Sequence, residues 1–317
     1  MRMPRGVNRA VPYGGFTSNA VFYAGLSGAG HCAGVATLQA TARIRESASM
    51  TLARNALEAA LETRDDGTLD MVRQAIRHRQ VMLAFQPVVQ AADTTRVAFH
   101  EAMVRVLDET GRIIPARDFI MAVEETEAGR ELDCIALEQG LAELARQPGL
   151  RLAVNMSARS IGYGRWMQVL LRGLDSAPTI GERLILEITE SSAMLVPELV
   201  SGFMTDLQRR GITFAMDDCG AGQTALRHMR GFSFDIMKID GQFARGIARD
   251  PDNQVLTRAL VAIADEFDMF TVAESVERAE DAQCLVALGV DCMQGYYFGA
   301  PTVSPPWRNT GTTRATA

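Results

Sequence analysis

Short apolar runs recur beyond residue 80, and most of them end abruptly in a polar side chain that could bind a cation or move a proton. These polar residues are Glu101, Asn155, Glu187, Asp217 with Asp218, Lys238, Glu274 and Gln294. Taken singly, an acidic residue after a strand is more often a helix N-cap than a metal ligand. If all of them face one site, the converging carboxylates repel one another and need cations or protons. The complete set therefore predicts a cation-binding centre.

The residue types also indicate which cation this centre would bind. Carboxylate and amide oxygens favour Mg²⁺ or Mn²⁺, whereas zinc would normally recruit His or Cys. The sequence has four histidines, none in ligand spacing with another: His31, His78, His100 and His228. Asp217 and Asp218 are adjacent, so their side chains can diverge toward two different metals. We therefore expect a two-metal hydrolytic site without zinc.

Eight of the apolar runs have the length of β-strands, and these strands must position the polar residues. They cover residues 81–85, 97–100, 152–154, 184–186, 212–216, 234–237, 270–273 and 290–293. Amphipathic stretches long enough for helices lie between most of them, for example at 132–144, 197–210 and 277–288. Gly211 and Gly289 stand where helices commonly end. Alternation of strand and helix implies a parallel sheet with helices outside, and eight units permit closure into a barrel.

The first connection departs from this pattern. Residues 86–96 are too few for the crossover helix that joins parallel neighbours, so strands one and two should be antiparallel. The expected fold is an α/β modified TIM (β/α)8 barrel with the first strand antiparallel. Catalytic groups of such barrels lie at the carboxyl ends of the strands, which is where the polar residues fall.

Composition is compatible with one such domain. A barrel of roughly 250 residues with terminal segments accounts for the 317 residues of the chain. The hydrophobic share of 47% and the charged share of 22% are close to the globular average and exclude disorder throughout. A net charge of −6 argues against binding a DNA or RNA polymer through a basic surface. The five cysteines are scattered without a CxxC pair, which favours a reducing, cytoplasmic location over a disulfide framework.

The first 46 residues differ from the rest. They are rich in Gly, Ala, Ser and Arg and lack an apolar period, which predicts a poorly ordered leader over 1–46. The uncharged stretch 20–38 faintly resembles a signal peptide but lacks a solid apolar block. We therefore expect no membrane insertion.

Two further segments flank the expected barrel. Helical spacing over 47–79, broken at Asp65-Asp66-Gly67, predicts two helices and a turn. We interpret 47–67 as a helical linker or cap and 68–303 as the barrel domain. Residues 304–317 are then expected to be a flexible tail.

Two motifs early in the barrel region resemble those of a known family. Phe85-Gln86-Pro87 and Glu101-Ala102-Met103-Val104-Arg105 are similar to the Tyr-Gln-Pro and Glu-Ala-Leu-x-Arg elements of EAL domains. Further matches follow in the family's order: Asp118-Phe119-Ile120, Glu124-Glu125-Thr126, Asn155-Met156-Ser157, Glu187-Ile188-Thr189-Glu190, Asp217-Asp218, Lys238-Ile239-Asp240, Ala273-Glu274-Ser275-Val276-Glu277 and Gln294-Gly295-Tyr296. Because so many motifs agree in order, the resemblance over 68–303 is very specific.

The resemblance implies an activity and a set of metal ligands. EAL phosphodiesterases hydrolyse one phosphodiester bond of the bacterial second messenger cyclic di-GMP and give the linear dinucleotide pGpG. The family implies Mg²⁺ or Mn²⁺ at a two-metal site, with cyclic di-GMP as substrate and a possible homodimer. By resemblance, the metal ligands are Glu101, Asn155, Glu187, Asp217 and Asp218.

The resemblance also implies catalytic and substrate-binding roles. Lys238 would hold or deprotonate the attacking water, Gln294 would hydrogen-bond near it, and Glu274 would complete the metal and water shell. Glu190 would order the loop after Asp217-Asp218. The implied substrate-binding residues are Gln86, Arg105 and Asp240, each of which could instead be a structural polar group.

Two departures from the family pattern bear on activity. The loop 219–226 keeps its glycines and its leucine, but Ala221 cannot supply the hydroxyl with which Glu190 would interact. Ser275 stands where the family has glycine, and its β-carbon would strain the backbone if φ is positive there. The changes in the 219–226 loop bear on loop order, metal occupancy and dimerisation.

Three hypotheses for function follow. The first is an active metal-dependent phosphodiesterase, because every implied metal and water residue is present. The alternative is a catalytically inactive EAL domain that acts as a cyclic di-GMP receptor or protein-interaction module, which the altered loop supports. A metabolic barrel enzyme rests on fold analogy alone, and fold does not determine function.

Overall fold

The computed structural model describes residues 64–220 and 231–309. The chain divides into two units, Met1–Ala60 and Leu61–Ala317, and all described residues belong to the second. The predicted leader and most of the predicted linker lie outside the described residues. Within them, no helix combines the length and apolar character that crossing a membrane requires.

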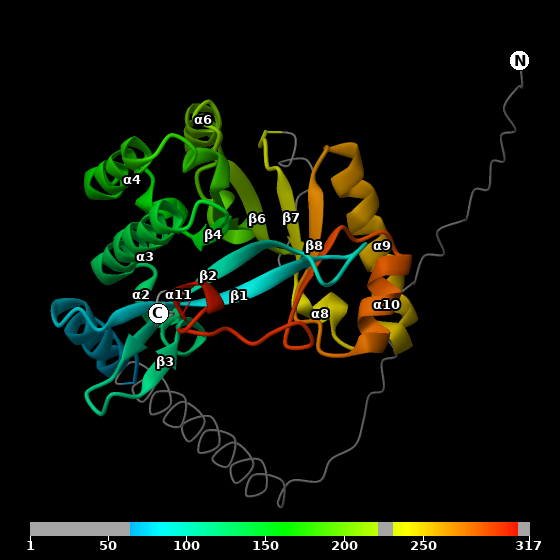
Figure 1. Cartoon of the computed structure of the whole chain (residues 1–317), viewed down its shortest axis with the longest axis horizontal. Helices are drawn as coiled ribbons and strands as arrows, with labels where there is room; N and C mark the ends of the chain where they lie inside the picture. The colour runs from blue at the N-terminus through cyan, green and yellow to red at the C-terminus, as the bar shows by residue number, and fades with distance from the viewer. Residues whose placement is uncertain (1–63, 221–230, 310–317) are drawn as a thin grey trace, which may run out of the picture. The chain divides into compact units, whose positions relative to one another are not determined.

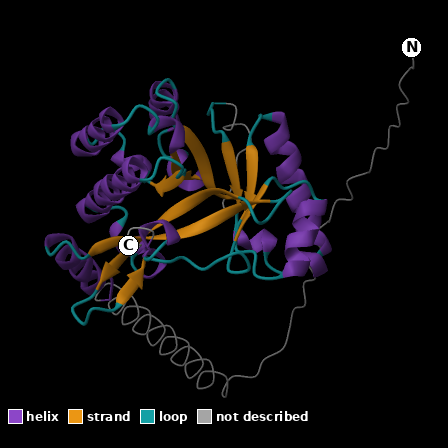
Figure 2. Cartoon of the chain, viewed as in Figure 1, coloured by secondary structure: helices purple, strands orange, loops and turns teal. Residues whose placement is uncertain are grey.

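Nine strands form the sheet, and eight of them close into a barrel (Figures 1 and 2). Their order is β1-β9-β8-β7-β6-β5-β4-β2-β3, with an additional pairing of β1 and β2 that completes the ring. The strands are β1 Val81–Gln90, β2 Val97–Leu107, β3 Ile113–Pro115, β4 Leu152–Asn155, β5 Leu184–Thr189, β6 Thr213–Cys219, β7 Ile236–Ile239, β8 Phe270–Ala273 and β9 Cys292–Gln294. The short β3, which the sequence analysis did not predict, pairs with β2 outside the ring.

The strand directions confirm the expected barrel. Strand β1 is antiparallel to both of its neighbours, β2 and β9, whereas the remaining barrel strands are parallel to one another. The connection from β1 to β2 is a tight turn in which the Asp93 carboxylate accepts hydrogen bonds from the backbone and hydroxyl of Thr95. Six residues are enough for a hairpin but not for a helical crossover.

Among the described residues, helices lie between the successive parallel strands except between β6 and β7, where residues 221–230 are not described. A first helix covers residues 64–77. The α-helices that follow it in the described part are α2 Ile120–Val123, α3 Glu127–Arg146, α4 Gly164–Ser176, α5 Glu190–Ala193, α6 Pro197–Gln208, α8 Gly241–Ala244, α9 Pro251–Glu266, α10 Ala279–Ala287 and α11 Pro306–Asn309. The 3₁₀ turns are η1 Ala116–Asp118, η2 Ala158–Ser160, η3 Gly181–Arg183 and η4 Ile247–Arg249. Figure 1 shows α3, α4 and α6 on one side of the barrel and α9 and α10 on another. Gly211 and Gly289 adopt the left-handed conformation expected after α6 and α10, with φ of 83° and 89°.

The turn predicted at Asp65-Asp66-Gly67 is wrong, because residues 64–77 form one helix. A glycine inside a helix costs only about 1 kcal/mol. Packing outweighs that cost, since Val72 and Ala75 of this helix are buried in an apolar cluster with residues of β1 and β2.

The tail predicted to be flexible is also partly wrong, because its first residues belong to the fold. In α11, the indole of Trp307 packs edge-on against Phe85 and His100, with ring centroids 5.3 and 4.6 Å away. The indole Nε1 donates to Glu143 of α3 at 3.0 Å. Phe85 and His100 belong to β1 and β2, so α11 covers the outer face of this antiparallel pair, which a hairpin rather than a crossover helix connects. Residues 310–317 lie outside the described part.

The barrel interior contains an apolar layer that positions the candidate site. Seven buried residues, one from each of seven strands, form this layer: Val88, Phe99, Ala153, Ile185, Ala215, Ile236 and Val272. Side chains two residues apart on a strand share a face. The next inward-facing residue toward the rim is therefore the polar residue that the sequence analysis identified on β2, β4, β5, β6, β7 and β8.

Candidate active site

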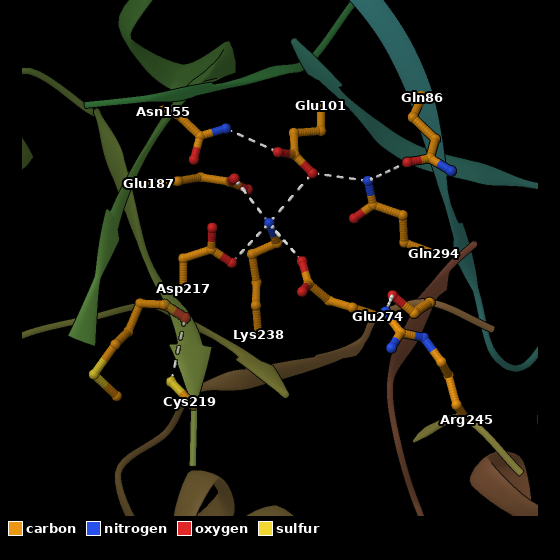
Figure 3. Close-up of polar contacts among 12 residues, drawn as sticks. Gln86, Glu101, Asn155, Glu187, Asp217, Cys219, Lys238, Arg245, Glu274 and Gln294 are labelled. Atoms are coloured by element: carbon orange, nitrogen blue, oxygen red, sulfur yellow. Dashed lines mark hydrogen bonds and ion pairs between the residues drawn. The ribbon is translucent and has the colours of Figure 1, made fainter. Parts of the chain in front are cut away.

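Lys238 is the centre of the polar layer at the barrel rim (Figure 3). Its Nζ lies 3.3 Å from Glu101, 2.9 Å from Glu187, 2.9 Å from Asp217 and 2.8 Å from Glu274. The lysine side chain is 1% exposed, and it reaches the rim from β7. The predicted convergence of strand-end residues is thus what the fold produces.

Amide side chains hold the Glu101 carboxylate from two sides. Asn155 donates its Nδ2 to Glu101 Oε1 at 2.8 Å, and Gln294 donates its Nε2 to Glu101 Oε2 at 2.7 Å. The same Gln294 nitrogen lies 3.0 Å from Gln86 Oε1, and Gln86 donates in turn to the carbonyl of Gly299. The chain therefore fixes this carboxylate through residues of β1, β4 and β9.

The balance of charge at the rim favours additional cations or protons. Burial, reinforced by the charge of Glu101, raises the pKa of Glu187 well above its usual value. Burial also raises the pKa of Glu274 to about 8 against the attraction of Lys238. Burial alone would raise the pKa of Glu101, but Lys238 and the amides lower it. One ammonium does not neutralise four carboxylates, which is the electrostatic condition expected of a metal centre.

The pKa of Lys238 is raised well above its usual range. Burial opposes this shift, and the charges of Asp217, Glu101, Glu187 and Glu274 outweigh it. In this arrangement the side chain is an ammonium that donates hydrogen bonds. Holding an oxygen ligand, one of the two roles expected from the sequence, requires a donor of this kind.

A bulge in β6 lets two adjacent carboxylates face the same rim. Neighbouring residues of a regular strand point to opposite faces. The register of β6 with β7 shifts between Met216 and Cys219, and Asp218 has a φ of 56°. As a result, Asp217, Asp218 and Glu274 each present a carboxylate oxygen within 4.8 Å of the others. Burial, together with the neighbouring Asp217, raises the pKa of Asp218 to about 6.

The donor set fits divalent metal with oxygen ligands. Glu187 Oε1 and Gln294 Oε1 are buried and have no hydrogen-bond partner among the described residues. Buried acceptors of this kind are costly unless a cation or water faces them. Together with the carboxylates of Asp217, Asp218 and Glu274, they offer oxygen ligands of the type that Mg²⁺ and Mn²⁺ prefer.

The three expected substrate-binding residues differ in position. Gln86 is 5% exposed and belongs to the buried amide network. Arg105 lies further along the Glu101 face of β2 and donates to the carbonyl of Val104 at 2.9 Å. Asp240 accepts from the backbone of Gln242 at 2.7 Å and caps α8, which is a structural role.

Glu190 contacts the start of the altered loop through the backbone. Its Oε2 accepts a hydrogen bond from the amide of Gly220 at 3.2 Å, and its side chain is buried. This contact does not require a hydroxyl at position 221, so the anchor persists despite Ala221. Residues 221–230 of the loop lie outside the described part.

The backbone of Ser275 has the positive φ that the sequence analysis named as the condition for strain. Its φ is 56°, a conformation in which a β-carbon is unfavourable.

The sequence analysis missed a half-buried aspartate that supports the loop after Asn155. The Asp133 carboxylate on α3 accepts from the backbone of Ser157 at 3.0 Å and from the hydroxyl of Ser160 at 2.6 Å. These bonds fix the loop that follows Asn155. The only sequence signal was an acidic residue among the apolar residues of α3.

A closed barrel with one reversed strand and an acidic centre at its rim defines a modified (β/α)8-barrel protein with a site suited to cations. The chain belongs to the EAL domain family, whose model matches residues 69–301.

Relatives and solved structures agree with this assignment. The chain is 27% identical over 237 residues to the cyclic di-GMP phosphodiesterase PdeF of Escherichia coli, a match that covers 74% of this chain and 31% of PdeF. An uncharacterized signaling protein of Caulobacter vibrioides is 33% identical over 233 residues, with 73% of this chain and 28% of the relative covered. The chain thus spans about a third of the length of these relatives.

Among solved structures, the PaMucR phosphodiesterase in complex with c-di-GMP has a TM-score of 0.67 at 27% identity and covers 76% of this chain and 99% of that one. The FimX EAL domain of Pseudomonas aeruginosa bound to c-di-GMP has a TM-score of 0.68 at 22% identity, covering 75% of this chain and 97% of that one. At that identity the second likeness concerns the fold.

Proposed function

We propose that this chain is a metal-dependent phosphodiesterase that hydrolyses cyclic di-GMP to pGpG. The observation that carries the proposal is the convergence of Glu101, Glu187, Asp217 and Glu274 on Lys238, with amide support from both sides. Relatives named as cyclic di-GMP phosphodiesterases support the choice of substrate.

The residues present would hold two Mg²⁺ or Mn²⁺ ions. Glu101, Asn155, Glu187 and Asp217 would bind one ion, and Asp217 with Asp218 the other, beside Glu274. When bound, such ions supply Lewis-acid polarisation of the phosphoryl oxygens and lower the pKa of coordinated water.

The side chains themselves would orient the reacting groups. The Lys238 ammonium would donate hydrogen bonds to the attacking water and hold it in the polar layer. Gln294 would fix the Glu101 carboxylate and hydrogen-bond near that water. Hydrolysis forms a bond between the water oxygen and phosphorus, breaks the bond from phosphorus to the 3′ oxygen, and transfers a proton to that oxygen.

A cyclic di-GMP receptor without turnover is the second candidate. It is favoured by the strained Ser275 directly after Glu274 and by the departure of the 219–226 loop from the family pattern. A homodimer and a cytoplasmic location belong to the same set of proposals, since both follow from the resemblance and the cysteine pattern rather than from the described contacts.

The test is a time course of the purified full chain with cyclic di-GMP and Mg²⁺ or Mn²⁺, resolved by chromatography. We expect pGpG from the wild type, none above background from Glu101→Ala, and normal turnover from Glu138→Ala, an exposed glutamate of α3. Binding of cyclic di-GMP without product would favour the receptor. If the wild type neither binds cyclic di-GMP nor forms product, both candidate functions are refuted.

A further inference from the structure

Arg245 is exposed on the Glu274 side of the barrel rim, and its contacts indicate a function. We propose that Arg245 is a further substrate-binding residue, which Ser275 holds in place to contact a phosphate of the cyclic dinucleotide. This inference rests on the proposed function and adds a phosphate contact to it.

Ser275 is held in a conformation that glycine would adopt more easily. Its φ of 56° lies in the left-handed region, which is unfavourable for a residue with a β-carbon. Such strain persists where surrounding contacts fix it, and it clusters at functional sites. Ser275 directly follows Glu274, whose carboxylate contacts Lys238. The serine therefore stands beside the reacting centre.

A glycine opposite Ser275 makes room for its side chain. A β-carbon at Gly241 would contact Ser275 Oγ and would lie 2.6 Å from Ser275 Cβ, which is closer than such atoms approach. Gly241 begins α8, three residues after Lys238. Ser275 and Gly241 are thus a matched pair, and the space between β7 and β8 contains the hydroxyl.

The hydroxyl of Ser275 positions Arg245. The guanidinium NH2 of Arg245 donates to Ser275 Oγ at 3.2 Å, and its Nε lies 4.0 Å from Glu277. In the view of Figure 3, the Arg245 guanidinium lies close to Glu274. The Arg245 side chain is 61% exposed. A guanidinium has five N–H donors, so donors remain that can form a two-pronged contact with a phosphate.

The charge of the rim explains why an arginine is useful there. Asp217, Asp218 and Glu274 form an acidic group that repels an anionic dinucleotide wherever metal does not neutralise it. Lys238 is surrounded by carboxylates, and Arg105 donates to a carbonyl of its own strand. Arg245 adds a positive charge at the solvent side of Glu274, where a substrate phosphate would arrive.

The variants Arg245→Gln, Arg245→Lys, Ser275→Ala and Ser275→Gly test the proposal. Arg249→Gln is the matched control, because Arg249 is 74% exposed on the next turn and pairs with Glu280. For each full-length variant we would measure kcat and KM for cyclic di-GMP with Mg²⁺, and the Kd for cyclic di-GMP by calorimetry with Ca²⁺ in place of Mg²⁺. Chromatography checks that no product forms during the calorimetry, and thermal unfolding gives Tm.

We expect Arg245→Gln to raise KM and Kd about tenfold with little change in kcat, as loss of a uniform binding contact requires. The KM and Kd of Arg245→Lys should lie between those of the wild type and Arg245→Gln, because lysine keeps the positive charge but cannot form the two-pronged contact of a guanidinium. Ser275→Gly should raise Tm by removing strain and still raise Kd about threefold, since one lost hydrogen bond is worth roughly that factor. Ser275→Ala should raise Kd similarly without raising Tm.

The outcomes separate this proposal from the proposed function. If the wild type hydrolyses cyclic di-GMP and Arg245→Gln has the same Kd and KM as the wild type, the assignment of Arg245 is wrong and the proposed function stands. If the wild type binds cyclic di-GMP without turnover and Arg245→Gln binds it more weakly, the proposed enzymatic activity is wrong and the contact between Arg245 and a substrate phosphate is supported. If Ser275→Gly raised Tm without changing Kd, the positioning role of Ser275 would be wrong.

Discussion

Gln294 Nε2 lies 2.7 Å from Glu101 Oε2, and these two residues are 193 positions apart in the chain. The contact crosses the reversed strand β1, because Gln86 of β1 accepts from the same Gln294 nitrogen. The barrel closure and the orientation of a candidate metal ligand thus depend on the same three side chains.

Gln294→Leu removes the amide that donates to Glu101 and Gln86, and it should weaken metal binding. Outer partners of metal ligands are worth roughly 10- to 100-fold in affinity or activity when removed. We expect a rise of that order in the Mg²⁺ concentration needed for half-maximal turnover, with a stability loss of about 1–3 kcal/mol from the unpaired acceptors. Gln283→Leu, at an exposed position of α10, is the control. Equal Mg²⁺ dependence of the two variants would refute the role of Gln294.

Lys238→Met leaves the converging carboxylates without their ammonium. Breaking a buried ion pair by removing one partner costs about 3–5 kcal/mol, so we expect the free energy of unfolding in EDTA to fall by that amount. Mg²⁺ should restore more stability to this variant than to the wild type, because the metal would supply the missing positive charge. Urea unfolding with and without Mg²⁺ measures both effects. Arg73→Met removes an exposed pair with Asp70 and should change little.

Adding one methyl group should have opposite effects on stability at two glycines, Gly295 and Gly202. A β-carbon at Gly295 would collide with the backbone of Val276. Gly295→Ala should therefore destabilise the fold by several times the ~1 kcal/mol of an ordinary substitution. Gly202 lies within α6, where nothing approaches the added carbon. Gly202→Ala should stabilise by about 0.5–1 kcal/mol. The Tm of each variant measures these effects, and equal Tm shifts in the two variants would contradict the prediction.

His100 predicts a pH dependence of stability. Burial lowers the pKa of His100 to about 4, below its ordinary 6.5. Between these values the unfolded chain binds more protons at this site, so the contribution of His100 is complete above pH 6.5 and is lost as the pH falls toward 4. His100→Phe keeps the ring contact with Trp307 and cannot be protonated. The wild type should lose stability relative to this variant across that window in urea unfolding. A constant difference would show that His100 does not titrate there.

Local sequence was sufficient to predict which strand-end side chains meet at the rim, because period-two alternation carries that information. On the strands other than the reversed β1, each apolar residue of the interior layer is followed two positions later by the polar residue of the rim, as for Ala153 and Asn155 or Ile236 and Lys238. Such pairs are visible in the sequence once the strand is identified.

Contacts between distant segments could not be predicted in this way. The turn signal at Gly67 was overridden by packing of Val72 and Ala75. Trp307 appeared to belong to a tail because its partners, Phe85 and His100, are more than 200 positions away. The bond from Arg245 to Ser275 joins two rim segments that no periodicity relates.

Lys238 is the only lysine in the sequence, which makes the centre of the site chemically addressable. Apart from the chain's amino terminus, an amine-directed reagent has this one target, and it is 1% exposed. Reductive methylation with isotope-labelled formaldehyde would therefore place a spectroscopic reporter at the middle of the polar layer, or fail to react while the layer remains closed. The labelling rate would report how often Lys238 is both exposed to solvent and deprotonated.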